Sequence, residues 1–159
     1  MTSTQFASPP APPATVTATT PILFGTDFSP ASDAAFRKAV EMARKEGAEL
    51  VIAHVYEPPS AASLETVKFS AEEMEQSTRA GAQKQLDALL AEAKAAGIKV
   101  RGVLLPGNAS EQLVSFAREN GAGLLVVGTH GRTGLSKLFT GSVASRLVAT
   151  APCPVLTVR

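Results

Sequence analysis

The glycine and serine residues near the end of the chain have the spacing of a phosphate-binding site. Two residues separate Gly128 from Gly131, and nine more lead to the pair Gly141-Ser142. Glycine lets the main chain approach a ligand closely, and the N–H groups at a helix start attract phosphate oxygens. We therefore interpret this stretch as a phosphate site. The alternative is that these glycines serve only as turns and as a helix cap.

Two better-known phosphate motifs do not fit the same residues. A P-loop has Lys and then Ser or Thr directly after its last glycine, whereas Gly141 is followed by Ser142 and Val143. The dinucleotide-binding fingerprint has a series of glycines after the first strand. The first apolar run instead ends in Gly25-Thr26-Asp27. Both motifs are excluded.

Charge is distributed unevenly along the chain, although the net charge is only +1. All fourteen acidic residues lie between Asp27 and Glu119. The last forty residues carry no acidic side chain and four basic ones: Arg132, Lys137, Arg146 and Arg159. An anionic ligand is expected at this cationic end, unless these bases are ordinary solvated side chains. The small net charge argues against a strongly basic nucleic-acid-binding protein.

The 159 residues are enough for one domain, which we place at residues 21–159. Sixteen of the first twenty residues are Ala, Pro, Thr or Ser and none has a charged side chain, so residues 1–20 are predicted to be a disordered tail. No run of eighteen apolar residues occurs, so we expect no membrane span. The single cysteine, Cys153, excludes an intramolecular disulfide and favours a cytoplasmic location.

Five short apolar runs alternate with four helical patterns within the predicted domain. The apolar runs are residues 22–26, 50–56, 100–105, 124–127 and 155–158. The helical patterns cover residues 30–46, about 70–96, 109–120 and about 141–149. Two of the runs are apolar at consecutive positions, which is typical of parallel strands buried on both faces. The alternation predicts an α/β fold with a doubly wound parallel sheet and helices on both faces.

Ligands of such sheets bind beyond the carboxyl ends of the strands, where the strand order reverses. Thr26 and Asp27 end the first run, and Gly128, Thr129 and His130 end the fourth. These two loops face each other across a crevice if the first and fourth strands are neighbours. The glycine pattern would then line that crevice.

At these residues the chain resembles the ATP-binding branch of the universal stress protein family, over residues 21–159. The family pattern G-x₂-G-x₉-G-[ST] is complete, and further similar segments are Thr26-Asp27-Phe28-Ser29, His54-Val55 and residues 154–158. The resemblance implies a five-stranded sheet in the order 3-2-1-4-5, which places the first and fourth strands side by side.

The resemblance also implies roles for individual residues. Asp27 matches an acidic residue that contacts the adenosine portion of ATP, and Val55 matches a position against adenine. The residues matched around the ribose and phosphates are Gly128, Gly131, Gly141, Ser142 and Val143. The neighbours Thr26, Thr129, His130, Arg132 and Ala144 complete the predicted nucleotide-binding set. Ala144 stands where some relatives carry a hydroxyl, so this chain lacks one side-chain contact to phosphate or metal.

The expected function is that of an ATP-binding stress-response module that signals or regulates through a protein partner. Mg²⁺ or Mn²⁺ would accompany the triphosphate, held mainly by phosphate oxygens and water. Within the glycine-rich loop the obvious candidate base is His130, so we expect slow or negligible turnover. The alternative is a weak ATPase or phosphotransferase. His54 and Cys153 are expected to be structural residues.

A homodimer is expected through the last strand, formed by Val155, Leu156, Thr157 and Val158. The resemblance implies this assembly, and the strand itself gives a second reason. An edge strand that is apolar and carries little protective charge tends to pair with another chain.

Overall fold

The computed structural model describes residues 19–60, 70–129 and 142–159. Its elements are, in chain order, β1 (Ile22–Thr26), α1 (Pro30–Glu46), β2 (Leu50–Tyr56), α3 (Ala71–Ala95), β3 (Val100–Pro106), α4 (Ala109–Glu119), β4 (Leu124–Gly128), α5 (Ser142–Thr150) and β5 (Val155–Val158). The predicted tail, apart from its last two residues, lies outside the described residues.

The five strands form one sheet in the order β3-β2-β1-β4-β5, and every neighbouring pair is parallel. This confirms the predicted fold class and strand order. β1 is central, and all five of its residues are buried, because helices cover both of its faces. Within the described residues, no helix is long and apolar enough to cross a membrane.

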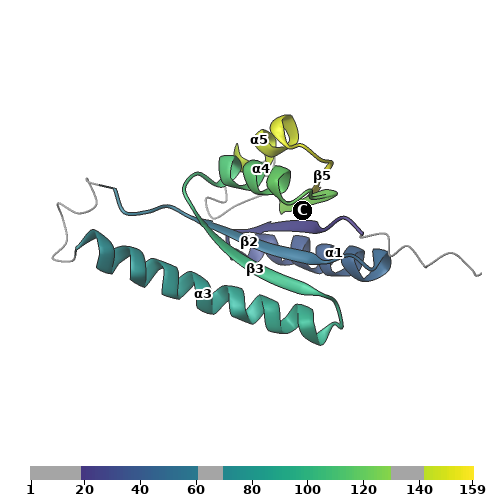
Figure 1. The fold of residues 1–159 in the computed structure, drawn as a ribbon, viewed down its shortest axis with the longest axis horizontal. Helices are drawn as coiled ribbons and strands as arrows, with labels where there is room; N and C mark the ends of the chain where they lie inside the picture. Colours follow the sequence, from purple (N-terminus) through teal and green to yellow (C-terminus); the bar gives the residue numbers. More distant parts are fainter. Residues whose placement is uncertain (1–18, 61–69, 130–141) are drawn as a thin grey trace, which may run out of the picture.

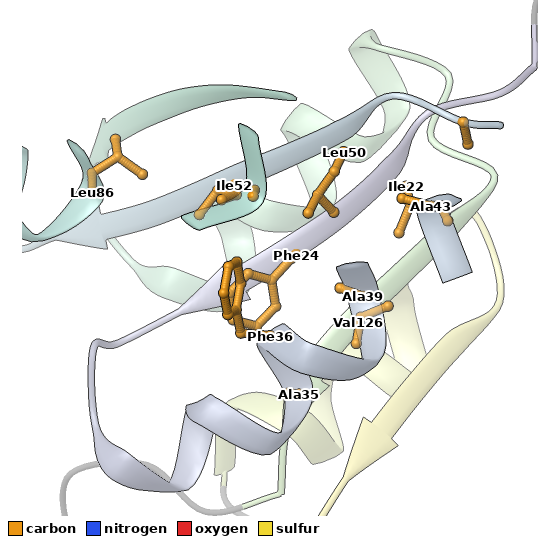
Figure 2. Packing of buried hydrophobic residues seen from close by; sticks show 12 residues of the cluster. Ile22, Phe24, Ala35, Phe36, Ala39, Ala43, Leu50, Ile52, Leu86 and Val126 are labelled. Carbon is orange, nitrogen blue, oxygen red and sulfur yellow. The ribbon is translucent and has the colours of Figure 1, made fainter. Parts of the chain in front are cut away.

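The helices divide between the two faces of the sheet (Figure 1). α1 and α3 cover one face, where Phe24 of β1 packs on Phe36 of α1 with ring centroids 5.7 Å apart (Figure 2). α4 and α5 cover the other face, where Leu113 and Leu147 pack against alternate residues of the same strands. Consecutive residues of the inner strands therefore point into different cores, which explains their continuous apolar runs.

Glycines end three of the helices where the sequence places them. Gly47, Gly97 and Gly121 have φ angles of 63°, 77° and 60°, in the left-handed region that glycine tolerates best. The helix starts at Pro30 and Ala109 are also as predicted. The sequence therefore indicates where each of these helices returns the chain to the next strand.

Candidate functional site

The carboxyl edge of the sheet brings together the ends of β1, β2 and β4. β1 and β4 pair from Ile22 opposite Leu124 to Gly25 opposite Val127, so Asp27 and Thr129 emerge from neighbouring strands. On the other side of β1, Thr26 pairs with His54 of β2. The two predicted loops therefore begin side by side, as the crevice requires.

The start of α5 also lies toward this edge. A short connection joins Thr150 to Val155, the first residue of β5. Because β5 is parallel to β4, the end of α5 lies toward the amino edge of the sheet, and its first residue, Ser142, lies toward the carboxyl edge. The N–H groups of this helix start, with the positive end of its dipole, therefore lie toward the carboxyl edge of the sheet.

The side chains at the beginning of α5 divide between solvent and core. Ser142 and Val143 are exposed, whereas the Ala144 side chain is buried in the apolar cluster beneath α4 and α5. Val55 is half-buried and packs against the same cluster. The position predicted for adenine and the start of α5 therefore share one face of the sheet.

The turn between β1 and α1 is held by hydrogen bonds that converge on Asp27. Its Oδ1 accepts from the main-chain N–H of Ser29 at 3.0 Å and from the Ser29 hydroxyl at 2.6 Å. Ser29 occupies the N-cap position of α1, but its side chain makes no capping hydrogen bond to the helix. The Ser29 hydroxyl therefore orients the Asp27 carboxylate instead of satisfying the helix start.

A second set of hydroxyl groups supports this turn from the α1 side. Ser32 Oγ donates to Ser29 O at 2.8 Å and lies 3.1 Å from Thr26 Oγ1. A hydroxyl has a single hydrogen, so Thr26 must donate to Ser32 in that contact. Thr26 Oγ1 also accepts from the N–H of Phe28 at 2.9 Å. All three hydroxyl-bearing residues are buried, which makes these bonds costly to break.

Phe28 has an unusual backbone conformation within this turn. Its φ of 59° lies in the left-handed region, where residues with a Cβ are uncommon. Its ring packs on the His54 imidazole with centroids 4.2 Å apart and an interplanar angle of 32°. His54 Nδ1 is 2.8 Å from Thr26 O, and since a carbonyl oxygen only accepts, Nδ1 is the donor.

Gly128 has a packing role that its place in the glycine pattern does not predict. A Cβ at this position would lie 3.1 Å from Ala31 O, at the start of α1. The neighbouring Thr129 is buried, and its N–H donates to Val158 O at 2.8 Å. Gly128 therefore lets the first turn of α1 approach β4, and the Thr129 amide is used to extend the pairing with β5.

The remaining predicted site residues, His130, Gly131, Arg132 and Gly141, lie outside the described residues. Among the residues that are described, no group of three His, Cys, Asp or Glu side chains could hold a metal ion by itself. Burial raises the pKa of the Cys153 thiol, which favours the unreactive protonated form.

Comparison with known proteins identifies the family. The model of the Universal stress protein family matches residues 19–159, which is nearly the whole chain. The chain belongs to this family. A curated relative, universal stress protein MJ0531 of Methanocaldococcus jannaschii, is 32% identical over 138 residues, which cover 87% of this chain and 81% of the relative.

Solved structures of universal stress proteins share the fold. UspA from Lactobacillus plantarum superposes with a TM-score of 0.77 at 23% identity, over 89% of this chain and 98% of the other. A universal stress protein solved in complex with cAMP superposes with a TM-score of 0.67 at 28% identity, over 89% of this chain and 98% of the other. The predicted site residues of this chain therefore belong to a universal stress protein fold, and a relative with 28% identity was solved with cAMP.

Proposed function

We propose that this universal stress protein binds ATP at the carboxyl edge of its sheet, in the crevice above β1 and β4. The adenine lies against Val55, Asp27 contacts the adenosine portion, and the phosphates face the glycine pattern and the start of α5. The nucleotide-binding set is Thr26, Asp27, Val55, Gly128, Thr129, His130, Gly131, Arg132, Gly141, Ser142, Val143 and Ala144.

The single observation that carries this proposal is the adjacency of β1 and β4. It brings an oriented carboxylate and the beginning of a glycine-rich, cationic segment to the same edge of the sheet. α5 contributes the positive end of a helix dipole, which stabilises phosphate oxygens. The complex of a relative with cAMP supports an adenine nucleotide as the ligand class.

The triphosphate would be accompanied by Mg²⁺ or Mn²⁺. The described side chains offer no ready-made cluster for the ion. Phosphate oxygens and water would therefore supply most of its ligands, as is common for Mg²⁺ at nucleotides. The ion would neutralise the phosphate charge together with Arg132 and Lys137.

The bound nucleotide would act as a signal in the stress response of the cytoplasm, with slow or negligible hydrolysis. The loaded protein would be a homodimer paired through β5, which is the last strand of the sheet. Its residues Val155, Leu156 and Val158 remain only half-buried within one chain. Pairing with a second copy would cover this apolar edge and present a larger surface to a protein partner.

The proposal is tested by calorimetric titration of the purified protein with ATP, ADP, AMP and cAMP. Gly131→Val should abolish binding, because the motif requires a main chain without a side chain beside the phosphates. Gly81→Val is the matched control, since Gly81 is exposed on α3 and a Cβ added there would meet no other atom within 4 Å. Equal ATP affinity in Gly131→Val and the wild type would contradict the proposed site. Turnover above roughly 1 s⁻¹ would favour an enzyme instead.

A further inference from the structure

His54 contacts the residues on both sides of Asp27. Its Nδ1 donates to the main-chain oxygen of Thr26 at 2.8 Å, and its ring packs on Phe28 with centroids 4.2 Å apart. His54 is held opposite Thr26 by the pairing of β1 with β2, so its position does not depend on the turn itself. A residue of one strand thus holds the turn that follows another.

The hydrogen bond to Thr26 orients the main chain at Asp27. The carbonyl of Thr26 and the N–H of Asp27 belong to one planar peptide group. Fixing the oxygen in space therefore fixes the direction of the Asp27 N–H and restricts the direction in which the Asp27 side chain leaves the backbone. Through this hydrogen bond, His54 of β2 influences the geometry of the proposed adenosine contact.

The ring contact holds the other side of Asp27. Phe28 has a φ of 59°, a conformation that costs free energy for any residue with a side chain and so needs support from its surroundings. Its N–H bond to Thr26 Oγ1 is one support, and the His54 ring is a second. On the side toward α3, Phe28 borders an open-sided cavity of about 210 Å³, lined also by Phe24, Phe36 and Leu89. Packing from that side is therefore incomplete.

We propose that His54 is a positioning residue for nucleotide binding, which keeps Asp27 in its binding conformation by holding Thr26 and Phe28. The inference rests on the proposed nucleotide-binding function. When the two contacts are lost, the turn samples other conformations, and the apparent affinity falls with the fraction of molecules that keep the competent one.

Three substitutions of His54 test the hydrogen bond to Thr26 and the ring contact with Phe28, each alone and both together. His54→Asn keeps an N–H donor near the position of Nδ1 but removes the ring. His54→Phe keeps a ring but removes the donor. His54→Ala removes both. Each single loss should weaken ATP binding about 2- to 10-fold, from the usual net worth of one hydrogen bond or one ring contact. His54→Ala should weaken it more than either of the others.

Two control variants distinguish positioning from a general loss of stability. Tyr56→Phe alters the next side chain on the same face of β2, which contacts Glu75 at 3.4 Å, and should bind ATP as the wild type does. Leu86→Ala removes a buried side chain of α3 that lies against Gly102 of β3, and should lower the melting temperature without changing affinity. If the loss of ATP affinity rises in proportion to the loss of melting temperature across all five variants, the proposal is overturned.

Amide hydrogen exchange of the free protein gives a readout that does not use nucleotide. The N–H groups of Phe28 and Ser29 bond to Thr26 Oγ1 and Asp27 Oδ1, so their exchange reports the order of the turn. We expect faster exchange at both in His54→Ala and no change in Tyr56→Phe. Unchanged exchange and unchanged ATP affinity in His54→Ala would overturn the inference alone. Failure of the wild-type chain to bind any adenine nucleotide would instead refute the proposed function, and this inference with it.

Discussion

The starts of α1 and of α3 and α4 use the same kind of residue in different ways. Ser70 accepts from the N–H of Glu73 at the start of α3, and Asn108 accepts from the N–H groups of Ser110 and Glu111 at the start of α4. Both side chains satisfy helix N–H groups that would otherwise lack a partner. Ser29 occupies the corresponding position of α1, but its hydroxyl donates a hydrogen bond to Asp27 instead. At the carboxyl end of the central strand, the polar side chains support a carboxylate rather than a helix.

This difference separates residues that stabilise the fold from residues that prepare the proposed site. The turn before α1 also contains Phe28, the one non-glycine residue with positive φ among the described residues. Backbone strain and an unused helix cap both cost stability, and they occur together beside the only acidic residue of this turn. Such costs are usual where a protein holds a group for binding. The comparison can be tested by substitutions at each helix start.

The largest effect is expected at Asp27. Asp27→Ala should weaken ATP binding by about 1.5–3 kcal/mol, the usual worth of a hydrogen bond to a charged group, and Asp27→Asn should weaken it less. Asn retains an oxygen that accepts from Ser29, so the turn keeps its shape while the charge is lost. Calorimetric titration with ATP measures both variants. Wild-type affinity in Asp27→Ala would show that the carboxylate oriented by Ser29 does not contact the ligand.

An intermediate effect is expected from removing the caps themselves. Asn108→Ala should lower the free energy of unfolding by about 1 kcal/mol, because two helix N–H groups lose their acceptor. Ser29→Ala removes no capping bond, so its stability loss comes from the hydrogen bond to Asp27. The two variants should differ in affinity, with Ser29→Ala weakening ATP binding and Asn108→Ala leaving it unchanged. Urea unfolding and calorimetry on the same samples measure both quantities. Equal ATP affinities in the two variants would mean that Ser29 acts only as a structural residue.

Much of the fold could be predicted from the sequence, because the signals that define it are local. Consecutive apolar residues indicate buried parallel strands, and Gly47, Gly97 and Gly121 mark helix ends that do adopt positive φ. The adjacency of β1 and β4, which the proposed site needs, was implied by the resemblance to the family, because the alternation of strands and helices alone leaves the strand order open. The strand patterns and the helix ends depend on residues only a few positions apart.

The support of the site could not be predicted in the same way. His54 and Thr26 are 28 positions apart, so their hydrogen bond appears only when β2 lies beside β1. Phenylalanine is not a residue type that indicates positive φ, so nothing in the local sequence marks the conformation of Phe28. The approach of Gly128 to Ala31 likewise depends on how α1 packs against β4. The chemistry of these residues was visible in the sequence, but their long-range contacts were not.

The smallest effect that we expect is a difference between the caps of α3 and α4 in how their contribution to stability depends on pH. The N–H of Ser70 and then its hydroxyl bond to the Glu73 carboxylate, and both lower the pKa of Glu73 below its ordinary value of 4.5. A group whose pKa is lower in the folded state stabilises that state above its unfolded pKa, and this contribution is lost as the pH falls through the folded value.

Glu73→Gln keeps a side chain that can complete the cap but does not titrate. The stability difference between the wild type and Glu73→Gln should therefore be present at neutral pH and should shrink below pH 4.5. Asn108 does not titrate, so the loss caused by Asn108→Ala should be nearly the same at both pH values. Urea unfolding of the three proteins at neutral and acidic pH measures these differences. A pH-independent difference for Glu73→Gln would show that the carboxylate charge does not stabilise the start of α3.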